Sequence, residues 1–318
     1  MKTSLDHLPR KKQRELARVV DILHEEFDAV VKAGSAEWKR RGRIYKIILF
    51  GSYARGGWVD EQHVGKGYQS DYDILVIVNH KKLSEGTDTG GSIWRVVEDR
   101  IERDRAIATP TQLIVHTLDE VNTELKKDRY FFKEVRADGI ALYEFTGSKS
   151  SGNRHHALAE PGNLTPKEVY ETAKEYFDHW HPSAAGFLDT SQYAQSQERL
   201  NEAAFLLHQA TERAYHAVLL TLTLYSPPGH NIQRLRGLAE ELDQRLIDAW
   251  PRGRRPYDRS CDLLRRAYVE ARYSKHYQIT KEELEWLADR VRHLQALVET
   301  VCTERLAQLK AQADTAAE

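Results

Sequence analysis

The sequence predicts an α+β protein in two parts: a domain with a mixed β-sheet over residues 1–145, and an all-α helical bundle over residues 164–318. Short apolar runs typical of buried strands recur in the first part. Beyond Leu164 the apolar residues recur instead at helical spacing. Residues 146–163 are rich in Gly, Ser and Asn and show no periodicity, so they are expected to form a flexible linker.

Within the first part, an amphipathic helix is expected over residues 10–33, where apolar side chains recur every three or four positions. Apolar runs rich in bulky residues predict three buried strands, over residues 43–50, 72–79 and 111–117. A helix is expected over 92–108. Thr117 and Glu120 form a capping box that starts a further helix, which Gly139 ends before "IALYEF".

The second part is expected to be helical throughout. Residues 196–225 carry one apolar stripe, and "SPPGHN" interrupts the helical pattern. Three more helical stretches follow, the last from about 280 to 311.

Composition narrows the class of protein. A chain of 318 residues with 41% hydrophobic and 30% charged residues is typical of a soluble globular protein. Cys261 and Cys302 are its two cysteines, too few for a cysteine-rich zinc site. No apolar run is long enough to span a membrane, and the first residues lack the apolar segment of a signal peptide, so the cytoplasm is the expected location.

One turn suggests phosphate binding. In "ILFGSYARGG" an apolar strand stops at Gly51, and Ser52 is expected to cap a helix that begins at Tyr53. The backbone N–H groups of a strand–glycine–helix turn can bind a phosphate. The alternative is an ordinary turn with no ligand.

Two carboxylates follow in "SDYDILVIV". Asp71 and Asp73 are two residues apart at the start of a strand, so both lie on one face. Neighbouring carboxylates repel unless a cation screens them, and magnesium can do so while also binding nucleotide phosphates. The alternative is a pair of exposed acids at a strand end.

The combination of "GSYARG" and "SDYDILV" resembles the nucleotidyltransferase superfamily of DNA polymerase beta and the kanamycin nucleotidyltransferases. The resemblance covers about residues 10–145. It implies that Gly51 and Ser52 hold the phosphates of a nucleoside triphosphate such as ATP, with help from Arg55. It also implies that Asp71 and Asp73 bind Mg²⁺.

The chain departs from this family in two places. Eighteen residues separate Ser52 from Asp71, and the extra "HVGKGY" (63–68) is expected to be a surface loop. Family members commonly carry a third carboxylate on a later strand, where this chain has Gln112. A glutamine cannot act as a base. His116 lies on the same face of that strand and is considered as a substitute, with a purely structural role as the alternative.

The helical part resembles a HEPN domain over about residues 195–300. Many HEPN domains are RNases that have four to six residues between an Arg and a His, whereas Arg272 and His276 here have three residues between them. On a helix this spacing would place both on one face. Residues 252–275 hold eight basic and three acidic side chains. This surplus is either a solvated loop and helix face or a surface that contacts the phosphates of RNA or a nucleotide.

These observations leave three functions open. The first is Mg²⁺-dependent transfer of a nucleoside monophosphate to a hydroxyl, with Tyr277 as a possible acceptor within a toxin–antitoxin-like system. The second is RNA cleavage by Arg272 and His276, regulated by the first domain. The third is a nucleotide-sensing module without catalysis. A homo-oligomer such as a dimer is expected, because a two-fold axis could bring two Arg272–His276 pairs together.

Overall fold

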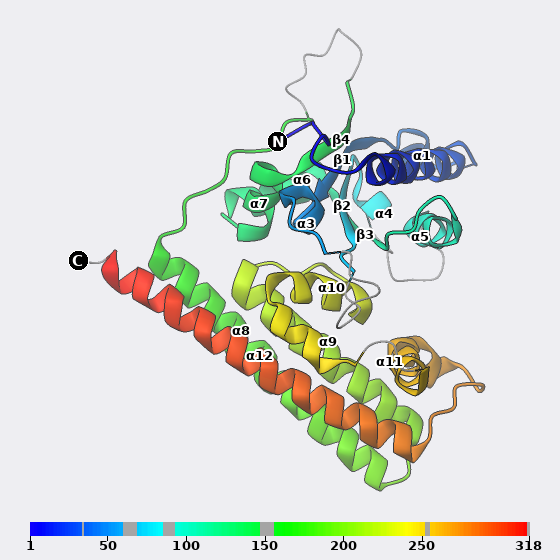
Figure 1. Ribbon diagram of the computed structural model, residues 1–318, viewed down its shortest axis with the longest axis vertical. Coiled ribbons are helices and arrows are strands. Elements are labelled where there is room, and N and C mark those ends of the chain that lie inside the picture. Colours follow the sequence, from blue (N-terminus) through cyan, green and yellow to red (C-terminus); the bar gives the residue numbers. More distant parts are fainter. Residues whose placement is uncertain (34, 60–68, 85–92, 147–155, 252–254, 317–318) are drawn as a thin grey trace. The chain divides into compact units, whose positions relative to one another are not determined.

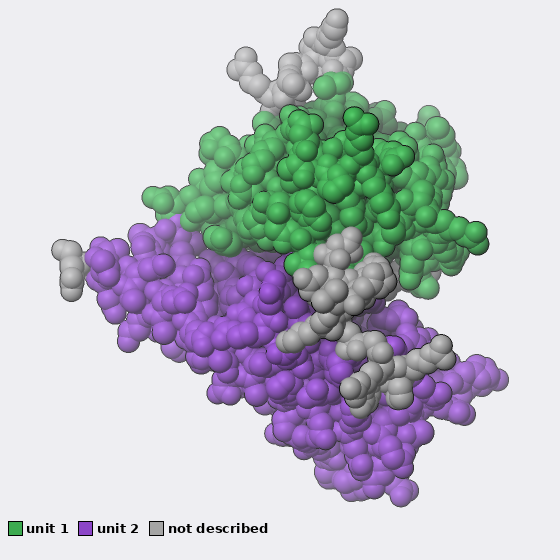
Figure 2. All heavy atoms as spheres, in the orientation of Figure 1, with its two compact units in different colours: residues 1–62, 68–163 green, residues 63–67, 164–318 purple. Residues whose placement is uncertain are grey.

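The computed structural model describes residues 1–33, 35–59, 69–84, 93–146, 156–251 and 255–316. The expected "HVGKGY" loop (63–68) lies outside these residues. So does the 147–155 part of the expected linker. Two compact units are found, one comprising residues 1–62 and 68–163 and the other residues 164–318 (Figure 2).

The first unit is built on a four-stranded sheet (Figure 1). Its strands are β1 (Ile44–Phe50), β2 (Tyr72–Val78), β3 (Thr111–Thr117) and β4 (Ile140–Glu144), in the order β3-β2-β1-β4. β1 runs antiparallel to β2 and β4, whereas β2 runs parallel to β3. The expected mixed sheet is therefore confirmed, with strand ends within one residue of those predicted for the first three strands.

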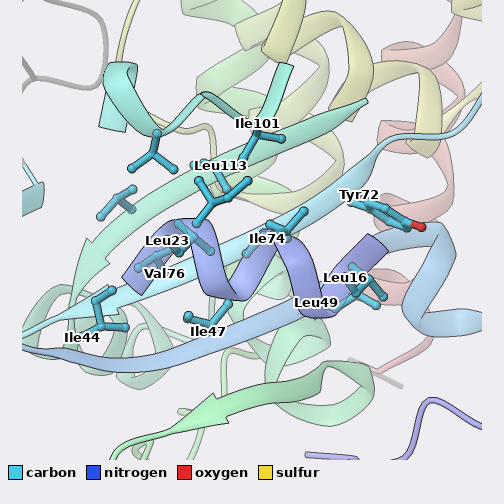
Figure 3. Close-up of a cluster of buried hydrophobic side chains, with 14 of the residues drawn as sticks. Leu16, Leu23, Ile44, Ile47, Leu49, Tyr72, Ile74, Val76, Ile101 and Leu113 are labelled. Atoms are coloured by element: carbon cyan, nitrogen blue, oxygen red, sulfur yellow. The ribbon is translucent and has the colours of Figure 1, made fainter. Parts of the chain in front are cut away.

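One face of the sheet carries the hydrophobic core of this unit. Helices α1 (Arg10–Ala33) and α5 (Ile93–Arg103) supply the opposing side chains, including Leu16, Leu23 and Ile101 (Figure 3). Alternate residues of the strands, such as Ile74 and Val76 of β2, point into this cluster because side chains alternate between the faces of a strand. The short helix α2 (Glu37–Arg40) contacts α1, and the short helix α4 (Lys81–Ser84) contacts β2 and β3.

The strands are also contacted by α3 (Gly51–Arg55), α6 (Leu118–Lys126) and α7 (Tyr130–Asp138). The capping box of Thr117 and Glu120 is present at the start of α6. The single helix expected from there to Gly139 is wrong, since the chain breaks it at residues 127–129, where Asp128 has a φ of 57°. Gly139 does end α7, and a Cβ there would lie 2.2 Å from the Val135 carbonyl oxygen.

The second part of the expected linker is held on the first unit. The Ala159 amide donates to Asn122 Oδ1 at 2.7 Å, and the Gly162 amide donates to the Leu125 carbonyl at 2.9 Å. Residues 156–163 are therefore hydrogen-bonded to α6 and do not form a flexible linker.

The second unit is a helical bundle, as expected. It comprises α8 (Pro166–Ser196), α9 (Leu200–Thr223), α10 (Ile232–Leu242), the 3₁₀ helix η2 (Gln244–Ala249), α11 (Arg255–Tyr273) and α12 (Lys281–Thr315). The long helices α8, α9 and α12 pack against one another (Figure 1). α9 is buried along most of its length, which explains its apolar sequence. Within the described residues, no helix combines the length and hydropathy that a membrane crossing needs.

Candidate functional site

The turn between β1 and α3 differs from its expected form. α3 begins at Gly51, whose φ of 72° is in the left-handed region that favours glycine, and Phe50 occupies the N-cap position. Ser52 therefore lies inside the helix and does not cap it. Its Oγ is buried and has no hydrogen-bond partner among the described residues. A buried hydroxyl without a partner is costly, so this one is a candidate for a hydrogen bond with a ligand.

The two expected metal ligands lie beside this turn. In the sheet, Asp73 of β2 is the register partner of Phe50, the residue directly before Gly51. Asp73 is only 2% exposed, and Asp71 is partly buried just before β2 begins. The alternation of side chains along an extended chain puts both on the face opposite Tyr72 and the core. Two acids are thus concentrated beside a glycine turn.

Gln112, which occupies the position where the resemblance implies a third carboxylate, lies beside this pair. It is the register partner of Asp73 in the parallel β2–β3 ladder, and its Nε2 donates to Asp71 Oδ2 at 3.3 Å. The third position of the site therefore carries a neutral hydrogen-bond donor. Its amide orients Asp71 and cannot accept a proton from a substrate hydroxyl at neutral pH.

His116 does not replace the missing carboxylate. It is the register partner of Ile77, four residues along β3 from Gln112, or roughly 13 Å at strand spacing. Its Nδ1 lies 3.3 Å from Glu120 Oε2, and its ring packs edge-on against Phe132. The hydrogen bond with His116 lowers the pKa of Glu120 to about 2 despite partial burial. These contacts favour the structural role.

Arg55 follows the turn at the end of α3. Its Nη1 donates to Glu134 of α7, so the ion pair joins these two helices on the side of the sheet that carries Asp73. If Arg55 contacts a phosphate, its guanidinium is shared between that phosphate and Glu134.

The donor set fits magnesium with a nucleotide. Carboxylate oxygens are hard ligands, and Mg²⁺ in such sites is held by one or two carboxylates together with substrate phosphates. No cluster of three or more metal-binding side chains occurs among the described residues. The remaining ligands would therefore come from phosphate oxygens and water.

In the helical unit, Arg272 and His276 do not share a helix face. α11 ends at Tyr273, and His276 lies in the turn that follows, so the expected helical juxtaposition is wrong. The Nε of Arg272 donates to the Tyr268 carbonyl at 2.6 Å, and its guanidinium lies over the rings of Tyr268 and Phe205. His276 is exposed, and among the described residues no hydrogen bond joins it to Arg272.

Tyr277 is unsuited to the expected role of acceptor in this conformation. It is 4% exposed, and its hydroxyl donates to the Leu263 carbonyl at 3.0 Å. Burial raises the pKa of this phenol. Tyr273, at the end of α11, is 77% exposed, and its ring contacts the guanidinium of Arg272.

The basic stretch at 252–275 is more balanced than its sequence indicates. Arg265 and Arg266 both pair with Asp262 of α11, at 2.7 and 2.9 Å, and Arg259 pairs with Glu283 of α12 at 2.8 Å. Arg266 also pairs with Glu270. Arg252 and Arg254 lie outside the described residues. Much of the charge that would attract RNA is thus neutralised within the unit.

A histidine that the sequence analysis did not single out lies near Arg272. The His230 ring stacks on Tyr268 at 3.9 Å between centroids, on the same residue that Arg272 contacts. His230 Nδ1 lies 3.1 Å from Oε2 of buried Glu212, while its side chain stays 41% exposed. A partly exposed imidazole fixed by a buried carboxylate is a common form of acid–base group.

Comparison with known proteins agrees with both units. The profile of the nucleotidyltransferase domain matches residues 31–138, and that of the HEPN domain matches residues 177–301. A Methanocaldococcus jannaschii protein that carries the provisional name protein adenylyltransferase is 56% identical over 39 residues. That match covers 12% of this chain and 31% of the archaeal protein. The chain therefore consists of a nucleotidyltransferase domain followed by a C-terminal HEPN domain.

Proposed function

We propose that the first unit transfers a nucleoside monophosphate from Mg²⁺·ATP to a protein hydroxyl. The observation that carries this proposal is the grouping of Asp71, Asp73 and Ser52 around the Gly51 turn, with the Ser52 hydroxyl buried and without a partner among the described residues. The provisional name of the archaeal relative favours the same reaction class, although the match covers only part of that protein.

Each residue has a role in this scheme. Ser52 and the backbone N–H groups of its turn bind phosphate oxygens. Asp71 and Asp73 would hold Mg²⁺, which supplies charge neutralisation for the phosphates when it is bound. Gln112 keeps Asp71 oriented through its Nε2 hydrogen bond. Because Gln112 is no base, the acceptor proton goes to Asp71, the more exposed of the two acids.

We place the acceptor at Tyr273 rather than at Tyr277. In the transfer, the tyrosine oxygen forms a bond to the α-phosphorus, and the bond from that phosphorus to the bridging oxygen breaks to release pyrophosphate. The acceptor hydroxyl must be able to reach a nucleotide site, either that of the same chain or that of a second copy. The exposed Tyr273 meets this condition, whereas the Tyr277 hydroxyl is buried and hydrogen-bonded.

The binding part of the proposal is tested by calorimetry with ATP and Mg²⁺. The double variant Asp71→Asn, Asp73→Asn should lose Mg²⁺-dependent binding. Ser52→Ala should weaken binding by about tenfold, the worth of one hydrogen bond to a charged group. Asp21→Asn, at an exposed acid of α1, is the matched control and should bind as wild type does. Unchanged affinity in the double variant would refute the site.

The transfer part is tested by intact mass and peptide mapping after incubation with ATP and Mg²⁺. A mass increase equal to AMP is expected on Tyr273 and should disappear in Tyr273→Phe. Tyr193, which is 67% exposed in the same unit, serves as the control for unspecific labelling. Label on Tyr193 as well as Tyr273 would mean unspecific modification, and label on Tyr277 would restore the residue that the sequence favoured.

RNA cleavage by the helical unit is the second candidate, and the His230–Glu212 pair beside Arg272 is the observation that favours it. His230 would exchange a proton with the phosphodiester, and Arg272 would stabilise its negative charge. The test compares His230→Ala with His276→Ala on single-stranded RNA without metal. Loss of cleavage in the first variant alone supports this assignment, whereas loss in the second alone returns the role to His276.

A further inference from the structure

A cavity of about 290 Å³ lies in the helical unit, and neither Arg272, His230 nor Tyr273 lines it. Its walls come from α9, α10, α11 and the segment after η2, and include Tyr215, Ile232, Trp250 and Leu264. A cavity of about 150 Å³ can hold benzene, so this one has room for a two-ring molecule. Binding pockets are commonly apolar with a few convergent polar groups, and this composition fits that description.

A positioned hydrogen-bond donor lies in the wall. Arg236 of α10 lines the cavity with its side chain 23% exposed, and its Nε donates to the buried carboxylate of Glu240 at 2.6 Å. That bond fixes the plane of the guanidinium. Its Nη2 is buried and has no acceptor within the described part of the chain. This nitrogen can therefore donate to an acceptor on a ligand.

A second polar group points to the same ligand chemistry. The Tyr215 hydroxyl accepts a hydrogen bond from Trp250 Nε1 at 2.8 Å, and no described residue accepts its own proton. Burial raises the pKa of this phenol, so it remains a donor at neutral pH. A ligand with acceptor atoms would satisfy donors that the protein leaves unmatched.

The charges of the wall exclude a strongly anionic ligand. Two cations, Arg236 and Arg265, and two anions, Asp258 and Asp262, line the cavity. Arg265 is already paired with Asp262 at 2.7 Å. Since the sum is zero, a nucleoside triphosphate would bring about four negative charges without a matching field.

We infer that this cavity binds a neutral, planar, two-ring heterocycle that presents a hydrogen-bond acceptor to Arg236. Apolar rings would pack between Trp250 and the aliphatic wall. A carbonyl or ring nitrogen would accept from the guanidinium. The inference does not depend on the nucleotidyl transfer proposed above.

The test uses quinazolin-4(3H)-one, an uncharged bicycle with a carbonyl, and follows its binding to the full chain by calorimetry. Arg236→Lys keeps the positive charge for Glu240 but removes the planar fork, so binding should weaken by about tenfold or more. Arg292→Lys is the matched control, because Arg292 is exposed on α12 and pairs with Asp289. Cys261→Trp fills the cavity and should abolish binding.

Alkylation of Cys261 gives a second readout that needs no variant. The thiol lines the cavity, and burial raises its pKa to about 11, so it reacts slowly. The heterocycle should slow its reaction with iodoacetamide further, while buried Cys302 serves as the internal reference. Unslowed alkylation, or equal binding by wild type and Arg236→Lys, would overturn the inference. So would displacement of the heterocycle from this cavity by 2-naphthoate or ATP at equal concentration.

Discussion

Glu212 is expected to be the most sensitive single acid of the helical unit. It is buried in α9 and lies within 3.1–3.7 Å of ring nitrogens of His208, His216 and His230. Burial opposes its charged form, but the hydrogen bonds from the three histidines outweigh burial and hold its pKa well below the usual range. The variant Glu212→Gln keeps the shape of the side chain and removes the charge.

The magnitude follows from what the charge balances. His208 is fully buried, and its Nδ1 and Nε2 lie 3.0 and 3.1 Å from the carbonyl oxygens of Leu264 and His230. The Glu212 carboxylate faces the rings of three histidines, one of them fully buried, and Glu212→Gln removes the charged partner of this buried cluster. Breaking a buried pair of this kind by removing one partner costs about 3–5 kcal/mol. For a unit of this size, the melting temperature should fall by about 6–20 °C.

Thermal unfolding followed by far-UV circular dichroism measures this change at neutral pH. Glu202→Gln, at an exposed acid near the start of the same helix, is the control and should cost less than about 1 kcal/mol. A double-mutant cycle with His208→Gln should give a coupling energy of at least about 1 kcal/mol. Because the folded pKa of Glu212 is depressed, its contribution is complete above about pH 4.5 and is lost as pH falls further. A fall below about 1 kcal/mol in Glu212→Gln, or strict additivity in the cycle, would refute the buried ion pair.

Three further outcomes are expected in the two units. Gly139→Ala should destabilise the first unit by about 1–3 kcal/mol in urea unfolding, because the new Cβ would lie 2.2 Å from the Val135 carbonyl oxygen. Gly186 in α8 has open space around it, so Gly186→Ala should stabilise the second unit by up to about 1 kcal/mol. Thr117→Ala removes the capping box of α6 and should cost about 1 kcal/mol in the same assay. His116→Asn should raise the pKa of Glu120 above its value of about 2, as read by carboxyl NMR titration; in wild type the stability that Glu120 supplies is complete above about pH 4.5 and is lost as pH falls through 2.

Local patterns in the sequence were sufficient for the sheet and for the grouping at its edge. The apolar run before Gly51 and the alternation around Asp73 depend on neighbouring residues, so strand and face could be predicted from them. Gln112 could be placed beside the acids because it is the second residue of the next strand. The break between α6 and α7 was missed because Asp128 adopts a left-handed conformation that the helical periodicity of its neighbours does not reveal.

The second unit was harder to predict because its polar groups meet through tertiary packing. Arg272 and His276 are close in sequence, but α11 ends between them, and Arg272 turns to the rings of Tyr268 and Phe205 instead. His230 reaches Tyr268 from the segment before α10.

One signal was nevertheless visible in the sequence. His208, Glu212 and His216 recur every four residues in a helix that is buried along most of its length, and such a polar stripe must be satisfied internally. The spacing alone could have predicted a buried polar network in α9, and the missing partner was a histidine near the next helix start. The surplus of basic residues at 252–275 does not point to this network, because acids of the same stretch pair with Arg265 and Arg266 along the helix.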